Sequence, residues 1–460
     1  MNSYIFPALL IMPTLFMGSF NLQNTPSLTN KLSSSSTVQK TKIAGRKLIA
    51  STTATTYYVS GTGSDSNNGL TSSTAFRTIQ KAADLTKAGD TVMIMNGLYT
   101  NAYPSYVAYI NRSGTANAWI KFQAYPGHTP KIKHNGWHGI KITNGASYIE
   151  ISGLEVEGNN ANITLDYAKS QQSNGNNPLT SGNCISIDGR NTKPPHHIRI
   201  LNNKVHDCGG VGIGTAQADY VTIDGNEVYN NAWYSVYANS GISIYQSWNF
   251  DSNTGYKMIA TNNKVYNNRQ YIPWITTGTI TDGNGIIIDD SRNTQNRSTL
   301  GAYKGRTLVA NNITYNNGGS GIHSYFSDNV DIVNNTAYLN VQSPQLNNGQ
   351  IYASSSSNVQ ILNNIIYAAS TKRVNSNWGN KNIVYNYNVY ANSSWIEVKG
   401  ANDIVAAPQF INPSIGDFRV NVNSPAINRG TTFNTVKTDF IRNARPSAAN
   451  YDIGAYEYQF

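Results

Sequence analysis

The sequence predicts an all-β protein: a single-stranded right-handed parallel β-helix, or solenoid, with a short N-terminal capping helix. The main observation is a pattern of short strands and asparagine turns that recurs along most of the chain. The composition agrees, because the 38 Gly, the 30 Tyr and many Asn, Ser and Thr suit strands and turns better than helices. The length of 460 residues exceeds one ordinary globular core, which one elongated repeat body would explain.

Each repeat consists of a short strand, an asparagine turn, a second strand, a glycine-rich turn, and a third strand that begins with Gly-Ile. The aligned turn residues are Asn203, Asn226, Asn263, Asn312, Asn335 and Asn364. Their spacing runs from 23 to 49 residues, so residues beyond the roughly 20 or slightly more that a coil needs should leave as loops. Asparagine tolerates a left-handed backbone, and stacked side-chain amides can hydrogen-bond from coil to coil.

The two ends of the chain differ from the repeats. An apolar stretch at residues 4–20 leads us to expect a signal peptide at 1–25, followed by a Ser/Thr-rich linker at 26–56. Residues 57–100 are assigned to an N-terminal cap with a helix near 75–86, residues 101–400 to the coils, and residues 401–460 to a C-terminal closure. We therefore expect a secreted protein without a membrane span. Capped ends also favour a monomer.

The charge balance points to an anionic partner. With 34 Lys and Arg against 24 Asp and Glu, the net charge is +10 and the pI about 9.3. The basic residues are scattered and match no nucleic-acid motif, so an acidic polysaccharide is the expected partner rather than nucleic acid. Cys184 and Cys208 can form one bridge at most, and two separate buried thiols are expected.

Both ends of the repeat region carry a resemblance to a known family. The stretch "YYVSGTGSDSNNGLTSSTAFRTIQKAADLTKAGDTVMIMNGLYT" (57–100) resembles the N-terminal part of secreted bacterial β-helix proteins, including family 9 polysaccharide lyases of the pectate lyase type. "SPAINRG" and "DIGAYEY" look like the C-terminal part of the same group. The resemblance implies the fold but not the substrate, because β-helices also include hydrolases, epimerases and binding proteins.

Alternation along the Gly-Ile strands separates buried residues from outward ones. Pairs such as Ile242/Ile244 and Ile286/Ile288 are expected inside. The first outward column contains Ser186, Gly214, Ser243, Ile287, His323 and Tyr352, and the second contains Asp188, Ala216, Tyr245, Asp289, Tyr325 and Ala353.

Acidic residues gather where one of these strands ends, in "ITDGNGIIIDDSRN" (280–293). Adjacent carboxylates repel each other and resist burial, so they call for a partner. We expect a calcium site formed by Asp282, Asp289, Asp290 and Asp188, because Ca²⁺ prefers oxygen ligands. Family 9 lyases are similar in using a cluster of aspartates that includes an adjacent pair. The alternative is a structural turn in which Arg292 pairs with the acids.

The predicted reaction is β-elimination, in which a metal neutralises a uronate carboxylate and a base removes the C5 proton. The resemblance implies a lysine base, but the outward columns offer none near the acidic pair. His323 is the better-placed base and Tyr325 a possible acid, while Lys304 and Arg292 are further cationic candidates in the turn. His323 can equally be an outward residue with no role.

Three long additions enter just before Gly-Ile strands, at residues 158–182, 231–239 and 267–283. They should wall a groove beside the outward columns. We expect Tyr245, Trp233, Trp248 and Trp274 to bind sugar, because aromatic faces suit the C–H groups of sugar rings. The alternative is that these rings only pack the loops.

The leading hypothesis is a secreted, calcium-assisted lyase that acts on an acidic polysaccharide such as pectate or alginate. A glycoside hydrolase could use Asp188 with Asp289 or Asp290. However, three strand spacings place Asp188 and Asp289 roughly 14 Å apart, beyond the roughly 5 to 9.5 Å that the two hydrolytic mechanisms use. A third possibility is a non-enzymatic protein that binds glycans.

Overall fold

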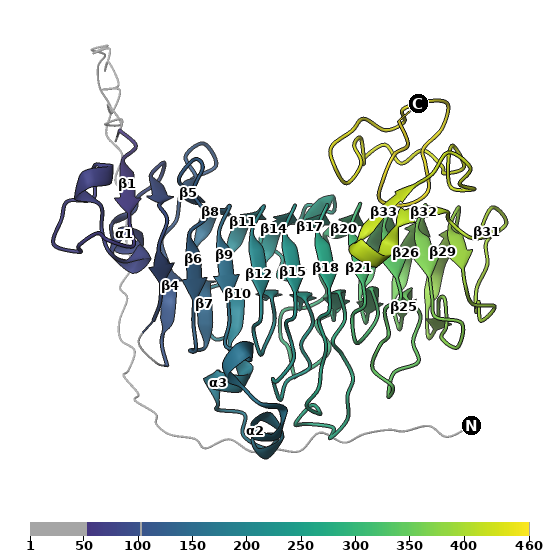
Figure 1. Cartoon of the computed structure of the whole chain (residues 1–460), viewed down its shortest axis with the longest axis horizontal. Coiled ribbons are helices and arrows are strands. Elements are labelled where there is room, and N and C mark those ends of the chain that lie inside the picture. The colour runs from purple at the N-terminus through teal and green to yellow at the C-terminus, as the bar shows by residue number, and fades with distance from the viewer. Residues whose placement is uncertain (1–52, 102–103, 460) are drawn as a thin grey trace, which may run out of the picture. The chain divides into compact units, whose positions relative to one another are not determined.

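The computed structural model describes residues 53–101 and 104–459, and these form a right-handed parallel β-helix (Figure 1). Each complete coil contributes one strand to each of three parallel sheets, which we name A, B and C. The predicted fold is therefore confirmed. The predicted signal peptide and nearly all of the predicted linker lie outside the described residues. None of the described helices is long and apolar enough to cross a membrane.

Sheet A consists, in spatial order, of β1 (Thr56–Val59), β2 (Thr91–Ile94), β5 (Ile120–Ala124), β8 (Ser147–Ser152), β11 (His196–Leu201), β14 (Asp219–Asp224), β17 (Tyr256–Thr261), β20 (Arg306–Ala310), β23 (Asp328–Val333), β26 (Ser357–Leu362) and β29 (Lys381–Asn386). Sheet B consists of β3 (Leu98–Tyr99), β6 (Lys131–Lys133), β9 (Glu155–Glu157), β12 (Lys204–His206), β15 (Glu227–Tyr229), β18 (Lys264–Tyr266), β21 (Ile313–Tyr315), β24 (Thr336–Tyr338), β27 (Ile365–Tyr367), β30 (Val389–Ala391) and β31 (Ile404–Val405).

Sheet C contains the Gly-Ile strands. In chain order it consists of β4 (Tyr106–Ile110), β7 (His138–Thr143), β10 (Asn183–Asp188), β13 (Ile213–Ala216), β16 (Ile242–Tyr245), β19 (Ile286–Asp289), β22 (Ile322–Tyr325), β25 (Ile351–Ser354) and β28 (Asn377–Trp378). The predicted inward residues of β16 and β19 are at most 1% exposed, so the alternation along these strands is confirmed. Aliphatic side chains from all three sheets form one continuous core.

A ladder of buried asparagines lies at the turn between sheets A and B. Each ladder side chain donates its amide to the side-chain oxygen of the next, as Asn263 does to Asn312 at 3.0 Å, and that oxygen also accepts the backbone N–H of Asn263 at 2.9 Å. The ladder runs through Asn203, Asn226, Asn263, Asn312, Asn335, Asn364 and Asn388 and ends on Asp403. The left-handed backbone lies one residue earlier than the ladder, at positions such as Asn262 and Asn311.

A second asparagine ladder, which the sequence analysis missed, lies at the turn that leaves sheet B. It runs through Asn231, Asn268, Asn317 and Asn340 and ends on Gln350. Asn231, Asn268 and Asn317 repeat the bonding of the first ladder, and Asn340 bonds to Gln350 through its backbone N–H. Two of the three corners of the coil are therefore fixed by amides that bond along the axis of the solenoid.

The helices lie outside the coils. The predicted N-terminal helix is α1 (Ile79–Leu85), whose first turn is capped by the Thr78 side chain, and its buried face packs on the first strands. The remaining helical segments are η1 (Ser72–Thr74), η2 (Asn160–Asn162), α2 (Leu165–Ser170), α3 (Pro178–Ser181) and η3 (Pro413–Ile415). Three of them, η2, α2 and α3, lie in the loop before β10.

The C-terminal segment packs beside the coils rather than only across their end. It contains β32 (Phe410–Asn412) and β33 (Asp417–Val420), which form an antiparallel pair. Phe418 packs against Ile313 of sheet B, and Val436 packs against Leu308 of sheet A. Figure 1 shows this yellow segment over sheets A and B, away from the loops that precede the strands of sheet C. The outward face of sheet C is therefore left uncovered by this segment.

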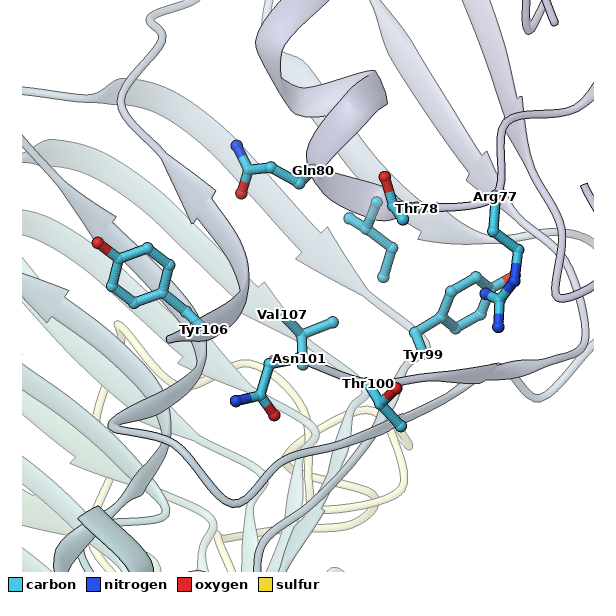
Figure 2. A pocket seen from close by; sticks show the side chains of 9 residues that line it. Arg77, Thr78, Gln80, Tyr99, Thr100, Asn101, Tyr106 and Val107 are labelled. Atoms are coloured by element: carbon cyan, nitrogen blue, oxygen red, sulfur yellow. The ribbon is translucent and has the colours of Figure 1, made fainter. Parts of the chain in front are cut away.

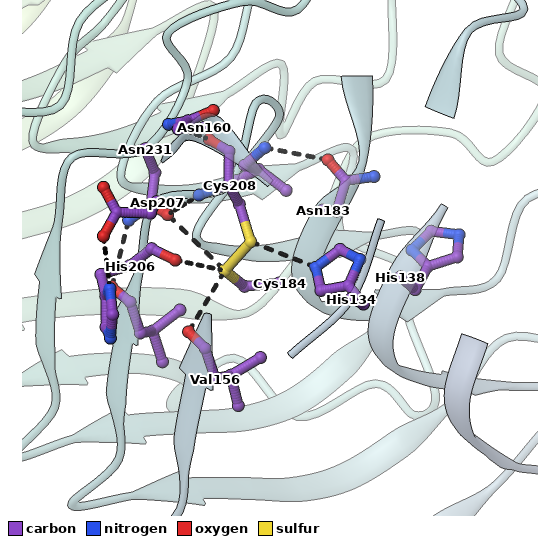
Figure 3. Close-up of a disulfide and its surroundings, with 12 residues drawn as sticks. His134, His138, Val156, Asn160, Asn183, Cys184, His206, Asp207, Cys208 and Asn231 are labelled. Atoms are coloured by element: carbon purple, nitrogen blue, oxygen red, sulfur yellow. Dashed lines mark hydrogen bonds and ion pairs between the residues drawn. A yellow bond between two sulfur atoms is a disulfide. The ribbon is translucent and has the colours of Figure 1, made fainter. Parts of the chain in front are cut away.

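The two cysteines form a disulfide, so the expectation of two separate thiols was wrong. Cys184 at the start of β10 is joined to Cys208, which follows β12 (Figure 3). Their separation of 24 positions in the sequence corresponds to one turn of the solenoid, and the stacking of neighbouring coils brings the two positions together. His134 lies against the bridge, with its Nε2 3.3 Å from the Cys208 sulfur.

We expect Asn312→Ala to lower the free energy of unfolding by about 3 kcal/mol. The substitution leaves the buried backbone N–H and side-chain amide of Asn263 without their acceptor. Urea denaturation followed by circular dichroism measures the effect. Asn423→Ala, at an exposed asparagine outside both ladders, is the control and should change stability by less than about 0.5 kcal/mol. Equal effects of the two substitutions would contradict a structural role for the ladder.

Candidate active site

The two predicted outward columns of sheet C are present in the structure. Consecutive strands pair without slippage, so that Tyr245, Asp289 and Tyr325 face one another on β16, β19 and β22. In the second column Tyr325 pairs with Ser354, which in turn pairs with Trp378 of β28, and the predicted Ala353 points into the core. This correction follows from the period-2 alternation, since Tyr352 and Ser354 must share a face.

Asp289 is the half-buried centre of the candidate site. Burial raises its pKa to about 8, and the carboxylates of Asp282 and Asp290 add to the shift. A hydrogen bond of 3.2 Å from Gln295 Nε2 acts in the opposite direction. At neutral pH this carboxyl group is therefore mostly protonated, and it ionises as the pH rises through about 8.

Asp282 approaches the same site from the loop before β19. Burial raises its pKa to about 6, although its Oδ1 accepts a hydrogen bond of 3.0 Å from Asn284. After burial, which is the largest cause for both groups, the charge of Asp282 also raises the pKa of Asp289 and of Tyr325. The structure thus brings together Asp282, Asp289 and Tyr325 from the predicted set.

Asp290 has contacts that favour the turn interpretation. Its backbone is left-handed, and its side chain is fully buried. Oδ1 accepts two hydrogen bonds from Thr294, while Oδ2 accepts one from Gln246 Nε2 and one from the Gln295 backbone N–H, all at 2.8–2.9 Å. These four donors hold the loop that follows β19.

Asp188 lies on β10, three strands from Asp289, and already has cationic partners. Arg190 donates to it through Nε and Nη2, both at 3.0 Å, and Lys141 Nζ lies 3.8 Å away. Although desolvation raises the pKa of Asp188, the bonds from Arg190 outweigh it and hold the pKa below its usual value. The strand order also confirms the three spacings that argue against Asp188 and Asp289 as a hydrolytic pair.

The predicted four-aspartate calcium site is therefore not assembled. In the described part of the chain, Asp188, Asp282, Asp289 and Asp290 provide no group of three ligand atoms that all lie within 4.8 Å of one another. Asp188 and Asp290 each use both oxygens to accept protein donors. The carboxyl group of Asp282 is crowded by Asp289 and would be relieved by a cation, so Asp282 fits a calcium ligand role best.

His323 is held by its neighbours on both sides. Its Nε2 hydrogen-bonds to Ser354 Oγ at 3.1 Å, its Nδ1 bonds to the Tyr352 hydroxyl at 3.2 Å, and the Tyr352 ring stacks on it. Burial lowers the pKa of His323 to about 3. A neutral imidazole whose two nitrogens are both hydrogen-bonded is a poor base. The contacts therefore favour a structural role for His323, in which it holds the Tyr352 ring.

The two predicted cations lie away from this centre. Arg292 forms a bidentate pair with Asp328 on sheet A, at 2.8–3.0 Å. This pair differs from the predicted one with the acidic cluster. Lys304 is exposed near the end of the same loop, where its backbone N–H donates to Asn249. Neither contact turns these side chains toward Asp289.

The predicted aromatic residues occupy different positions. Tyr245 faces Asp289, and its hydroxyl accepts a hydrogen bond of 2.6 Å from Asn296 Nδ2. Trp233 packs among the loops, where its indole donates to the Asn267 carbonyl. Trp274 begins a small hairpin in the loop before β19. Trp248 packs near His196 and Phe250 at the turn toward sheet A, away from the outward columns.

Loops wall both edges of the sheet C face. The three predicted loops, which extend below the body in Figure 1, share a small core of Ala168, Val236 and Ile272. The loop at 290–305, which the sequence analysis did not recognise as a wall, brings Gln295 to Asp289 and Asn296 to Tyr245. Its sequence signal was only its length.

Two further residues on this face were missed, Lys141 and Arg190. Lys141 lies on β7 in the first outward column, opposite Ser186. A signal existed, because "HGIKIT" begins with the same Gly-Ile pair as the later strands. Arg190 follows directly after β10.

Other clusters lie elsewhere. A pocket of about 380 Å³ near α1, lined by Arg77, Gln80, Tyr99 and Tyr106 among others, carries none of the acidic residues (Figure 2). On sheet B, Glu155, Glu157 and His206 are close enough to share a metal ion, but Lys131 and Lys133 already pair with the glutamates. The sheet C face therefore remains the candidate site.

Comparisons with known proteins agree with this architecture. Residues 57–358 match the family model described as the Pel9A-like right-handed β-helix region. The solved pectate lyase Pel9A is 16% identical, with 87% of this chain and 96% of that chain covered and a TM-score of 0.48. A rhamnogalacturonan lyase is 18% identical (78% and 91% covered, TM-score 0.40), and the GH136 lacto-N-biosidase from Eubacterium ramulus is 14% identical (76% and 67% covered, TM-score 0.44). No curated protein matches.

We expect the stability of the protein to fall as the pH rises from about 4 to about 8. Asp289 and Asp282 have folded-state pKa values of about 8 and about 6 against an ordinary value of 3.8. The folded state therefore binds more protons in this window, and ionisation opposes folding. Asp289→Asn should flatten the fall in melting temperature between pH 5 and pH 8, while Asp166→Asn, at an exposed carboxylate, is the control. Equal slopes in Asp289→Asn and wild type would contradict this assignment.

Proposed function

The chain belongs to the Pel9A-like right-handed β-helix family, and from this premise we propose that it is a secreted lyase that cleaves an acidic, uronate-containing polysaccharide by β-elimination. The observation that carries the proposal is the group formed by Asp282, Asp289 and Tyr325 on the walled face of sheet C. The positive net charge of +10 suits an anionic polymer. The disulfide suits an oxidising compartment outside the cell.

Asp289 is the proposed base, in place of His323. Elimination requires a group that takes the C5 proton and one that protonates the leaving oxygen. A carboxylate with a pKa of about 8 binds a proton far more strongly than an ordinary one, which suits it to remove a weakly acidic proton. Tyr325 stands on the neighbouring strand, and its pKa is raised, chiefly by burial, so its hydroxyl is protonated and can act as the acid.

A glycoside hydrolase is the second candidate. The observation that favours it is the pair of carboxyl groups, Asp282 and Asp289, whose pKa values differ by about two units on one face. Hydrolysis uses one protonated and one ionised carboxyl group, and such a difference assigns the two roles. In this case the products would be new reducing ends without an unsaturated sugar.

We expect wild type to produce the ultraviolet absorbance of an unsaturated uronate from pectate, alginate or another polyuronate. Asp289→Asn should lower kcat by about 10³-fold and Tyr325→Phe by about 10²-fold, because each removes a proton-transfer group. The kcat of wild type should rise with pH toward about 8 as Asp289 ionises. Asp166→Asn is the control. If new reducing ends appeared without the ultraviolet absorbance, the protein would be a hydrolase and not a lyase. If no glycan gave either product, the protein would bind glycans without cleaving them.

Calcium is part of the proposal, with Asp282 as its protein ligand beside the base Asp289. When bound, it would neutralise the uronate carboxylate. We expect added Ca²⁺ to raise the melting temperature more at pH 8 than at pH 5, because protons compete for a carboxyl group with a pKa of about 6. Asp282→Asn should abolish this shift. An equal shift in that variant would contradict a calcium site at Asp282.

A further inference from the structure

Two cations lie on the same face as Asp289, at a distance from it. Lys141 is on β7, and Arg190 follows β10, so that three strand spacings, roughly 14 Å, separate β10 from Asp289 on β19. The phenols of Tyr245 and Tyr237 raise the pKa of Arg190 further, after the larger effect of Asp188. The guanidinium is bonded to Asp188, which stands in the second outward column, so it lies at this face of sheet C.

Asp188 orients these two cations without neutralising them. It receives two N–H groups from Arg190 and has Lys141 at 3.8 Å, so one carboxylate faces two positive charges. The neighbouring His138 adds no charge, because burial, followed by Lys141 and other neighbours, lowers its pKa to about 3. The cluster therefore has a net charge of about +1.

Donors on both cations remain available. Among the described residues, Arg190 Nη1 makes no hydrogen bond, and Lys141 has Asp188 as its one ion-pair partner. The Arg190 side chain is 53% exposed and that of Lys141 24% exposed. An anion can therefore reach them from solvent.

Small side chains line most of the face between this cluster and Asp289. The outward residues of β10, β13 and β16 in the first column are Ser186, Gly214 and Ser243, and Ala216 is the β13 residue of the second column. Ser186 and Ala216 are 7% and 9% exposed, and the large side chain of these positions is Tyr245 on β16, next to Asp289. The small side chains therefore do not themselves block an extended polymer that lies along the axis of the solenoid. One chain can then touch both the cationic cluster and Asp289.

We propose that Lys141 and Arg190 form a carboxylate-binding subsite that holds a uronate of the same polymer several sugar units from the bond that is cleaved. The inference rests on the proposed function and deepens it. It makes Lys141 and Arg190 specificity-determining residues, which select polymers that carry a free carboxylate far from the reacting sugar. Asp188 is a positioning residue that presents the guanidinium.

Binding without turnover tests the subsite. In an Asp289→Asn background, calorimetry would compare long and short oligogalacturonates with a neutral oligosaccharide and a sulfated one of equal length. Lys141→Gln, and separately the charge-neutral pair Asp188→Asn/Arg190→Gln, should each weaken binding of the long uronate about tenfold. Oligomers too short to span three strand spacings cannot contact the cluster and Asp289 together, so the same substitutions should weaken their binding less than that of the long uronate.

Lys437→Gln, at an exposed lysine of the C-terminal segment, is the matched control and should bind like the parent. In active enzyme, Lys141→Gln should raise KM for long polyuronate about tenfold with kcat unchanged. Unchanged binding in both test variants would overturn the subsite while leaving the lyase intact. Tighter binding of the sulfated oligomer would overturn uronate as the occupant. If the parent bound no uronate oligomer at all, the proposed substrate class would fail, and the subsite with it.

Discussion

The structure depends on one constraint, the register between neighbouring coils. Inside the two asparagine ladders an amide donates to the next coil, while its oxygen accepts a buried backbone N–H and a side-chain amide from the coil before, as in Asn263 and Asn268. The ladders satisfy polar groups that would be costly to bury at a corner unpaired. They also fix the coils without slippage, so each outward residue lies about 4.8 Å from its neighbour. Asp289 faces Tyr245 and Tyr325 because this register holds.

The three corners of the solenoid differ in the length of their turns. At the corner between sheets A and B the turns are short, and the C-terminal segment packs over those two sheets. The other corners carry the long loops, before β10, β16 and β19 and again after β19. These loops do not enter the core, so they can lengthen without breaking the register. Sheet C is therefore the face that combines a fixed row of side chains with walls at both edges.

The sequence predicts the repetitive part of this structure well. The repeat revealed the fold, the first ladder and, apart from Ala353, both outward columns, because each follows from a local period. The repeat could not show which carboxylates accept hydrogen bonds from other residues of the protein. Asp290 is saturated by a turn that only the folded loop forms, and Asp188 is held by Arg190 and Lys141, the latter from an earlier coil. The disulfide likewise depends on two corners that stack one coil apart.

The acidic residues of sheet C have two kinds of environment. The two ends of the face therefore differ in charge and in proton binding. Asp188 is ionised beside two cations. This end of the face can therefore bind an anion, but its carboxylate is unsuited to proton transfer. Asp282 and Asp289 are crowded and poorly solvated, so protons bind there near neutral pH. An anionic polymer would be attracted at the first end and repelled by ionised carboxylates at the second. Protonation or a bound cation at Asp282 and Asp289 would remove that repulsion, which couples substrate entry to the charge state of the reacting groups.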